Sequence, residues 1–406
     1  MKKFKRSAQS QPKHGKPASS GASKAPVAPP VRRPGWTGPS YLHKPAKKTL
    51  TAVKDTASSI EQVQSLSVKH QQLILDTVRT TFPAVDEFSA LKPVLREIRE
   101  ALEQKDYCKA LGSEEFLEAY TIRWSPSKAL TMGNVLAWTC SEMSEAAWVQ
   151  QFLRNDGQKP SKIVCFGRGG SDLLASVALL KHSHESKLDE LSRPESPSPD
   201  HNDSAMVDLN LIDRHDWSGI VTKLQHTLTH PPPLSKYATA KAHASNIPAI
   251  PSHAINLAVN NLDILESDST TLRAIIGPNP ALITLFFTLH EFYSISISKT
   301  TAFLLRLTET APKGSLLLVV DSPGADVVLP GSSDKGEEKK YPLEWLLYQA
   351  LLPPKSSSTD SEEEEKPAWA KLVEGGHEKE YKLPTGLRFP GSLENTRFQV
   401  HLLQRL

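Results

Sequence analysis

Short apolar segments alternate with helical ones from about residue 158 of this 406-residue chain onward, and no other feature constrains its fold as much. Five segments rich in leucine and β-branched residues lie at 162–167, 206–213, 254–265, 281–289 and 314–321. Strands separated by helices usually pair in parallel, so this alternation predicts an α/β fold with helices on both faces of a mostly parallel sheet.

The end of the chain breaks the alternation. Two further strand candidates, residues 380–383 and 397–403, have no full helix between them. They predict an antiparallel hairpin at the edge of the sheet.

A helical region precedes the sheet. Apolar residues recur at helical spacing between residues 58 and 157, which predicts four or five helices. Ser113 before two glutamates and Ser125 before a proline are typical helix N-caps. We therefore expect a helical N-terminal region at 58–157 and a sheet domain at 158–406.

Three polar stretches are predicted to lie outside the core. Residues 1–57 are rich in Pro and Ser, and no acid precedes Asp55 among thirteen Lys and Arg. The remaining 35 Lys and Arg face 45 Asp and Glu, a net charge of about −10. This asymmetry predicts a disordered basic arm. Its functional interpretation is a nuclear localisation signal or a segment that binds RNA non-specifically, and the alternative is a solvated tail. Segments near 184–205 and 355–367 are expected to be disordered insertions.

The three cysteines show no paired spacing, which predicts neither a zinc site nor a disulfide framework and fits a reducing compartment. The chain contains no run of about 18 apolar residues and begins without an apolar leader segment. We expect a monomer without metal or membrane anchor. Its expected location is the nucleus or nucleolus, with the cytoplasm as the alternative.

A glycine-rich turn follows the first strand candidate. In "KIVCFGRGGSDLLASVALL", Gly167, Gly169 and Gly170 stand between an apolar strand and an apolar helix. Glycines at this junction allow a ligand to approach backbone N–H groups at the helix start. Asp172 stands where a dinucleotide fingerprint has glycine, and no P-loop lysine is present, so both phosphate-binding interpretations weaken. A purely structural turn remains the alternative.

Acidic residues mark the ends of the next two strand candidates. Asp213 ends the second, where a carboxylate can accept hydrogen bonds from ribose hydroxyls. Asp263 lies near the end of the third, where it could bind an adenine amino group. Their alternative roles are a helix N-cap for Asp213 and a turn residue for Asp263. Together with the glycine turn, they predict an adenosine-binding edge.

An adenosine site without a phosphate-binding lysine, in a sheet with a terminal hairpin, is typical of Rossmann-like class I S-adenosylmethionine-dependent methyltransferases. From about residue 70 onward the chain resembles the fungal family of 25S, large-subunit ribosomal RNA uridine N3 methyltransferases. The resemblance is carried by "EEFLEAYTIRWSPSKAL", "CFGRGGSDLLASVALL", "LIDRHDWSGIVTKLQHTLTHPPPLSKYA", "LFFTLHEFYSISISKTTAFLLRLT", "GSLLLVVDSPG", "YPLEWLL" and "LENTRFQVHLLQRL". It implies S-adenosylmethionine as cofactor and large-subunit ribosomal RNA or a pre-ribosome as partner.

The chain departs from the family at two places. The family's turn usually reads G-G-G-A-G-A-E, whereas this chain has Arg168 and Ser171 within "GRGGSDL". An arginine that points outward is compatible with cofactor binding, but one that points inward would place a cation beside the sulfonium and weaken binding. The family also favours asparagine where this chain has His290.

Methylation of uridine N3 requires loss of the N3 proton, and "TLHEFYS" after the fourth strand candidate offers His290 and Glu291 as general bases. Phe292 and Tyr293 could hold an extruded base between their rings. An ordinary core histidine with core aromatics is the alternative.

The segment "RWSPSK" places Arg123, Trp124 and Lys128 near a helix start, where they could bind RNA. Its alternative is a helix cap with a buried tryptophan. The leading hypothesis is thus an RNA uridine N3 methyltransferase. A catalytically silent, methyltransferase-like RNA-binding protein and a nicotinamide-dependent oxidoreductase are the rivals, and S-adenosylmethionine binding separates them.

Overall fold

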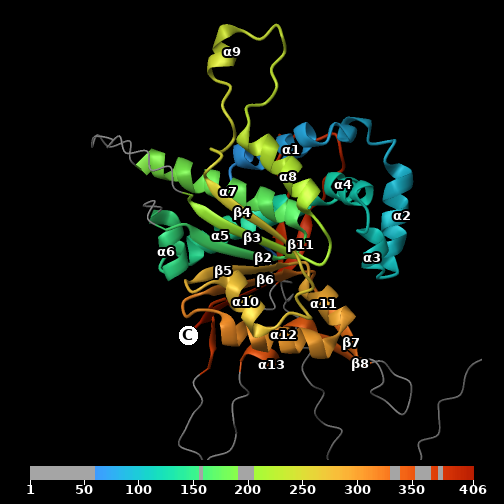
Figure 1. Ribbon diagram of the computed structural model, residues 1–406, viewed down its shortest axis with the longest axis vertical. Coiled ribbons are helices and arrows are strands. Elements are labelled where there is room, and N and C mark those ends of the chain that lie inside the picture. Colours follow the sequence, from blue (N-terminus) through green and yellow to red (C-terminus); the bar gives the residue numbers. More distant parts are fainter. Residues whose placement is uncertain (1–59, 155–158, 191–204, 330–338, 353–366, 374–377) are drawn as a thin grey trace, which may run out of the picture. The chain divides into compact units, whose positions relative to one another are not determined.

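One mixed sheet organises the computed structural model, which describes residues 60–154, 159–190, 205–329, 339–352, 367–373 and 378–406. Eight of its nine described strands lie side by side in the order β1-β10-β11-β6-β5-β2-β3-β4, and the ninth, β9, pairs with β11. Figure 1 labels the central strands of this sheet. The strands are β1 (Glu61–Gln62), β2 (Ser161–Phe166), β3 (Val207–Asp213), β4 (Ile255–Asn261), β5 (Ala281–Phe286), β6 (Leu316–Asp321), β9 (Trp369–Lys371), β10 (Glu378–Tyr381) and β11 (Thr396–Arg405). A separate antiparallel ribbon consists of β7 (Asp326–Leu329) and β8 (Lys339–Pro342).

The sheet confirms the predicted fold class. Strands β4, β3, β2, β5 and β6 are mutually parallel neighbours, as the alternation of strand and helix requires. The terminal strands β10 and β11 pair antiparallel, and β11 also runs antiparallel to β6. The hairpin does not end the sheet, because β1 pairs in parallel with β10. The helical region therefore contributes a strand that its apolar periodicity did not predict.

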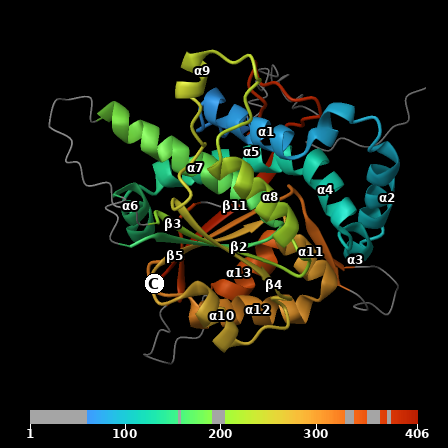
Figure 2. The same ribbon diagram turned by 45° about the horizontal axis from the view of Figure 1, so that its top comes forward.

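Helices cover both faces of this sheet. Figures 1 and 2 show α1, α5, α7 and α8 on one face and α10, α12 and α13 on the other. The helices are α1 (Val68–Thr81), the 3-10 helix η2 (Pro83–Glu87), α2 (Lys92–Glu103), α3 (Tyr107–Ala110), α4 (Glu114–Arg123), α5 (Ser125–Glu142), α6 (Ala147–Arg154), α7 (Gly169–Glu190), α8 (Ser218–Thr229), α9 (Ala240–Ala244), α10 (Ser269–Ile276), α11 (Leu289–Ile295), α12 (Ile297–Thr310) and α13 (Leu343–Leu351). The helical region thus contains six described α-helices rather than four or five. The four-residue α3 is too short to show a helical period.

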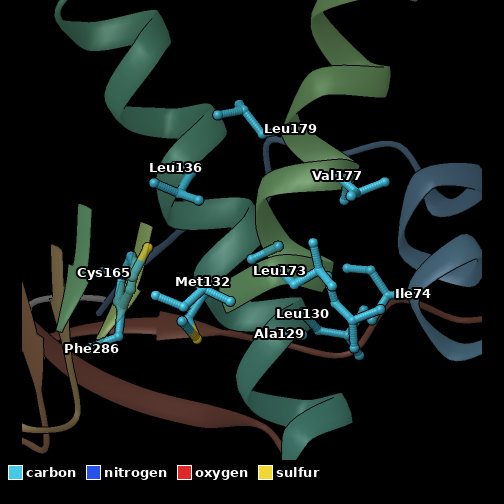
Figure 3. Close-up of a cluster of buried hydrophobic side chains, with 14 of the residues drawn as sticks. Ile74, Ala129, Leu130, Met132, Leu136, Cys165, Leu173, Val177, Leu179 and Phe286 are labelled. Atoms are coloured by element: carbon cyan, nitrogen blue, oxygen red, sulfur yellow. The ribbon is translucent and has the colours of Figure 1, made fainter. Parts of the chain in front are cut away.

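The strands are apolar at successive positions because the two faces bury two different cores. In β2, Ile163 and Cys165 join the cluster beneath α1, α5 and α7, whereas Val164 and Phe166 join the cluster beneath α10, α12 and α13. Figure 3 shows the first cluster, in which side chains of α5 and α7 interdigitate above the sheet. A strand buried on both faces follows from this arrangement.

The starts of α4 and α5 show whether the two predicted N-cap residues cap a helix. The Ser113 side chain accepts a hydrogen bond from the Phe116 N–H at 3.2 Å, which confirms that cap. Ser125 is instead the first residue of α5, and the preceding Trp124 occupies the cap position without a side-chain bond.

The described residues include only some of the predicted segment boundaries. Helix α7 continues to Glu190, so the first residues of the insertion expected at 184–205 are helical. Residues 191–204, residues 355–366 of the second insertion and the basic arm at 1–57 lie outside the described residues. The described residues between 60 and 406 form one compact unit. We retain the division between 157 and 158 as a proposal.

Candidate functional site

A cleft, here called the first cleft, opens where β2, β3, β4 and β5 end. Open α/β sheets bind ligands at this carboxyl edge. The first cleft is lined by Tyr107, Leu111, Gly167, Arg168, Ile212, Asp213, Arg214, His215, Leu262, Asp263, Ile264, Leu265, Thr288, Glu291, Phe292 and Ile295.

The glycine turn contributes to the first cleft through Gly167, which lies between β2 and α7. A Cβ atom added there would lie 3.3 Å from Thr288 Cγ2. Gly169 and Gly170 instead face α8, where an added Cβ would lie 3.2 Å from Trp217 Cβ and 3.4 Å from Leu224 Cδ1, respectively. Close packing of α7 against α8 therefore accounts for these two glycines, and Gly167 is the one that borders the ligand space.

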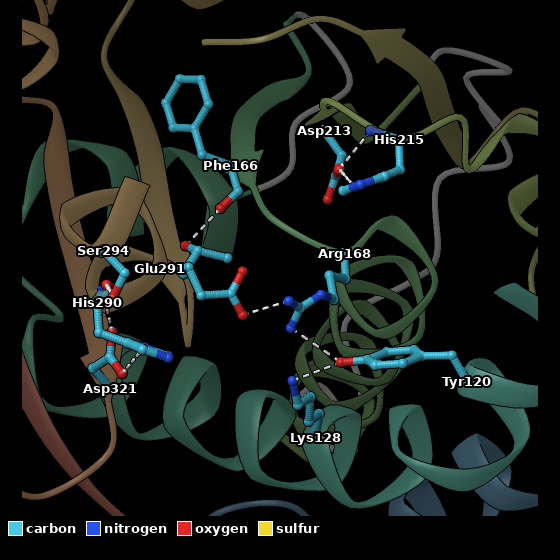
Figure 4. A network of polar contacts seen from close by, with 11 residues as sticks. Tyr120, Lys128, Phe166, Arg168, Asp213, His215, His290, Glu291, Ser294 and Asp321 are labelled. Atoms are coloured by element: carbon cyan, nitrogen blue, oxygen red, sulfur yellow. Dashed lines mark hydrogen bonds and ion pairs between the residues drawn. The ribbon is translucent and has the colours of Figure 1, made fainter. Parts of the chain in front are cut away.

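Asp213 lines the first cleft at the end of β3, and the structure excludes its alternative role as a helix cap. Helix α8 begins five residues later, where the Asp216 side chain accepts from the Ser218 N–H at 2.9 Å. Asp213 Oδ1 accepts from the backbone N–H of His215 at 2.7 Å and lies 2.9 Å from its Nδ1 (Figure 4). Among the described residues Oδ2 has no such partner, so it is available to ligand hydroxyls.

His215 also lines this cleft, and sequence reasoning missed it. Its Nε2 is buried and has no hydrogen-bond partner in the described part of the chain. A buried polar atom without a partner at the wall of a cleft is typical of a ligand contact. Asp263 lines the same wall, although its Oδ1 also accepts from the Leu265 N–H at 3.1 Å. Asp263 therefore combines its predicted site position with its alternative role in a turn.

A second carboxyl group lies behind the glycine turn. Asp172 is 3% exposed, and its Oδ2 would lie 3.7 Å from a Cβ atom added to Gly167. Burial, reinforced by the negative charge of Asp213, raises the pKa of Asp172 to about 7. This carboxyl therefore titrates near neutral pH.

The raised pKa of Asp172 predicts a pH-dependent effect of Asp172→Asn on stability. The folded protein holds a proton that the unfolded chain releases near pH 4, so the folded state loses stability as pH rises from about 4 to 7. The neutral amide avoids that loss. We expect the variant to gain about 2 kcal/mol relative to wild type between pH 5 and pH 8, measured by urea unfolding. An equal difference at both pH values would contradict the prediction.

Arg168 points inward, which is the orientation expected from the sequence to weaken cofactor binding. Its side chain is only 8% exposed and forms an ion pair with Glu291 on α11 (Figure 4). Its Nη1 also donates to Tyr120 Oη at 3.1 Å. Burial opposes the positive charge, but Glu291, Tyr120 and Asp213 raise the pKa of Arg168 above its usual range. The predicted repulsion of a bound sulfonium is offset because Glu291 neutralises the guanidinium.

A second cleft, of about 280 Å³, adjoins the first and shares Tyr107, Arg168 and Glu291 with it. Its wall is rich in aromatic rings. The second cleft is lined by Leu102, Tyr107, Tyr120, Trp124, Lys128, Arg168, Phe287, His290, Glu291 and Ser322. The shared wall brings the contents of the two clefts next to each other.

His290 is held in the second cleft by a buried carboxylate. Its Nδ1 lies 2.6 Å from Oδ1 of Asp321, which is 0% exposed, and the His290 backbone N–H donates to Oδ2 at 3.1 Å. The Nδ1 contact is a close charge contact outside hydrogen-bond geometry, so the backbone hydrogen bond is what ties His290 to Asp321. A carboxylate at this distance favours a positive charge on the ring. Asp321 ends β6 and was not predicted as a site residue. The arrangement supplies an oriented base at the second cleft.

The backbone is strained beside His290. Phe287 follows β5 and has a φ angle of 56°, which is rare for an aromatic residue. Such strain persists where the surrounding structure enforces it and is frequent at functional sites. The Phe287 N–H donates to the Val320 carbonyl at 2.7 Å, which ties the turn to β6. The strained turn places the Phe287 ring in the wall of the second cleft.

The remaining predicted residues are dispersed. Trp124 and Lys128 line the second cleft, and Lys128 Nζ donates to Tyr120 Oη at 2.8 Å. Phe292 lines the first cleft instead of the second. Arg123 lines neither described cleft and pairs with Glu394.

The sequence prediction placed Tyr293 against an extruded base, with a core aromatic as the alternative, and the structure favours the alternative. Tyr293 is 2% exposed in the core beneath α12, so it cannot hold a base beside Phe292. Positions 292 and 293 diverge because consecutive residues of a helix face different directions.

The described helices include none with the length and hydropathy to span a bilayer. Likewise, the described side chains form no group of three or more His, Cys, Asp or Glu that could hold a metal ion.

Comparison with known proteins assigns the family. The model of Methyltransf_34, a SAM-dependent methyltransferase family, matches residues 78–404, which is most of the chain. The chain belongs to this family. The methyltransferase is also 26% identical over 351 residues to the 25S rRNA (uridine(2843)-N(3))-methyltransferase of Saccharomyces cerevisiae, covering 84% of this chain and 87% of the relative.

Solved methyltransferase structures share low similarity with this methyltransferase. An S-adenosylmethionine-dependent methyltransferase from Clostridium acetobutylicum has a TM-score of 0.26 and 9% identity, covering 67% of this chain and 98% of its own. An O-methyltransferase family protein from Burkholderia thailandensis has a TM-score of 0.29 and 11% identity, covering 83% and 70%. The fold class rests on the strand order of the methyltransferase itself.

The first cleft fits S-adenosylmethionine, the cofactor of the family. The available Asp213 Oδ2 can accept hydrogen bonds from ribose hydroxyls, and His215 Nε2 is a further polar atom without a protein partner. Apolar Leu262 and Ile264 line the wall beside Asp263, where an adenine ring would be buried. When bound, the cofactor supplies a methyl group on a positively charged sulfur.

Proposed function

We propose that this methyltransferase methylates N3 of a uridine in large-subunit ribosomal RNA. The observation that carries the proposal is the aromatic second cleft, which contains an oriented histidine and shares a wall with the cofactor cleft. The yeast relative, whose name specifies uridine N3 of 25S rRNA, supports the choice of substrate.

The second cleft has the chemistry of a nucleobase pocket. Trp124, Tyr120 and Phe287 line it, and the Tyr120 and Trp124 centroids lie 5.1 Å apart. Trp124 is the most exposed of the three rings, since Tyr120 and Phe287 are buried. Rings of this kind stack on a base that has left its helix. Lys128 lines this wall beside the paired Arg168 and can attract the phosphate backbone.

We assign proton removal to His290. Uridine N3 carries a proton at neutral pH, and this proton must leave as the N3–methyl bond forms. In the proposed step, His290 Nε2 accepts the N3 proton, and the negative charge of buried Asp321, 2.6 Å from Nδ1, stabilises the imidazolium. Glu291 is occupied by the ion pair with Arg168, so we do not assign it the role of base.

The basic arm at residues 1–57 completes the proposal. Its thirteen Lys and Arg before the first acid suit nuclear entry and non-specific capture of RNA. We therefore propose a nuclear or nucleolar site of action on ribosomal RNA or a pre-ribosome.

Trp124→Ala is expected to lower kcat/KM for RNA by about 10-fold, because stacking of one base on an aromatic ring contributes about 1–3 kcal/mol. Affinity for S-adenosylhomocysteine should not change, since Trp124 does not line the first cleft. Trp345→Ala is the matched control, because that tryptophan is 47% exposed on α13. Equal effects of the two substitutions would remove Trp124 from the base pocket.

The substrate is tested directly with purified protein, labelled S-adenosylmethionine and large-subunit ribosomal RNA that lacks modification. Nucleoside mass spectrometry should detect N3-methyluridine in the digested RNA. A different methylated nucleoside would contradict the assignment of uridine N3. Absence of any methylated nucleoside with a cofactor-binding preparation would contradict the choice of RNA.

A further inference from the structure

We propose that the Arg168–Glu291 ion pair binds the amino-acid end of S-adenosylmethionine, with Arg168 on the carboxylate and Glu291 on the ammonium group. The inference rests on the cofactor of the family and not on the proposed uridine substrate. It gives a function to the residue by which this chain departs from the glycine usual in the family's turn.

The position of the pair along the first cleft supports this assignment. The neighbouring strands β4, β3, β2 and β5 bring Asp263, Asp213, Arg168 and Glu291 to the cleft in that order. An adenosine that is bound by Asp263 and Asp213 directs its sulfur-linked chain toward β2 and β5. Arg168 and Glu291 lie at that end.

The charges of the pair match those of the ligand. The amino-acid end carries one carboxylate and one ammonium group, and the ion pair presents one guanidinium and one carboxylate. Both side chains are sheltered from water, at 8% and 15% exposed, which strengthens charged hydrogen bonds. A zwitterion that binds there adds no net charge to the cleft.

Arg168 retains donors for this ligand. A guanidinium has five N–H donors, and hydrogen bonds among the described residues use one on Nη1, to Tyr120, and one on Nη2, to Glu291. The planar guanidinium favours paired hydrogen bonds to a carboxylate. Glu291 accepts through Oε1, so Oε2 can receive an ammonium N–H.

Three adenosine ligands separate the two contacts in a calorimetric experiment on the full chain without RNA. S-adenosylhomocysteine carries the carboxylate and the ammonium group, decarboxylated S-adenosylhomocysteine carries only the ammonium group, and 5′-methylthioadenosine carries neither; all three are uncharged at sulfur. Arg168→Gln should weaken S-adenosylhomocysteine about 10-fold or more and change the other two by less than about twofold. Glu291→Gln should weaken both ligands that carry the ammonium group and spare 5′-methylthioadenosine.

Controls distinguish a ligand contact from damage to the cleft. Unchanged binding of 5′-methylthioadenosine reports an intact adenosine site. Arg79→Gln removes an exposed guanidinium that pairs with Asp86 at 2.9 Å and should affect none of the three ligands. Arg168→Lys keeps the charge without the planar fork, so it should give an intermediate loss for S-adenosylhomocysteine and provides a second variant if the glutamine variant does not fold.

Equal weakening of all three ligands by Arg168→Gln would overturn the inference, because the arginine would then only support the wall. Unchanged S-adenosylhomocysteine binding in the same variant would overturn it as well. Neither outcome depends on the RNA substrate, which nucleoside analysis tests separately.

Discussion

Replacement of His290 by alanine is expected to lower the rate of methyl transfer by about 100-fold or more, the usual contribution of a positioned general base. The reason is the geometry at the end of β5, where the carboxylate of Asp321 lies 2.6 Å from Nδ1 and favours the charge that the ring gains when Nε2 accepts the uridine N3 proton. Single-turnover kinetics with bound RNA measures this step. Affinity for S-adenosylhomocysteine should stay within about twofold, since His290 does not line the first cleft.

His290→Asn decides whether His290 transfers a proton or only forms a hydrogen bond. Asparagine is the residue that the family resemblance leads us to expect at this position, and its amide cannot accept a proton at neutral pH. We expect the asparagine variant to be impaired about as strongly as the alanine variant. His226→Ala, on α8 and outside both described clefts, is the control and should keep wild-type turnover. Full turnover of His290→Asn would contradict proton transfer by His290.

Replacement of Asp213 by asparagine is expected to weaken S-adenosylhomocysteine by about 10- to 100-fold, as expected for loss of a charged hydrogen-bond acceptor. Asp213 Oδ1 is already used by His215, so the oxygen that faces ribose hydroxyls is Oδ2. The asparagine side chain replaces one carboxylate oxygen by an NH2 donor and removes the charge. Calorimetry measures the change directly.

Asp216→Asn is the matched control for Asp213. This acid lies three residues further along and caps α8 through the Ser218 N–H, outside the lining of the first cleft. Its asparagine variant should bind S-adenosylhomocysteine within about twofold of wild type. If both variants bind with wild-type affinity, the ribose contact proposed for Asp213 is wrong.

The sheet could be predicted from the sequence because its strands are buried on both faces. Continuous apolar segments such as 162–166 and 316–320 show burial by composition alone, and the helices between them require parallel pairing. The short β1 could not be predicted, because its two exposed residues pair with β10, more than 300 residues away.

The first cleft could be located from strand ends, since the ends of parallel strands meet at one edge. The structure brings Gly167, Asp213 and Asp263, which this reasoning placed at one edge, to one cleft. The strand ends did not predict that an added Cβ at Gly169 or Gly170 would meet residues at or before α8, which follows about 50 residues later, and a cofactor contact of these two glycines stays a prediction.

The second cleft depends on contacts between distant segments and therefore could be predicted only in part. Asp321 meets His290 across the ends of β5 and β6, and no local pattern relates the two residues. Arg168 turns inward because Tyr120 and Glu291, from two other helices, supply its partners. The positive φ of Phe287 has no sequence signal, since glycine rather than phenylalanine is typical of that conformation.

Complementation most directly tests the central claim that this chain is a uridine N3 methyltransferase of large-subunit ribosomal RNA. The chain would be expressed in a Saccharomyces cerevisiae strain that lacks the related 25S rRNA methyltransferase, and N3-methyluridine would be quantified in purified 25S rRNA. We predict that the wild-type chain restores the modified nucleoside and that His290→Ala, expressed at the same level, does not. Absence of N3-methyluridine despite a folded wild-type chain that binds S-adenosylhomocysteine and associates with the ribosomal RNA would contradict the claim.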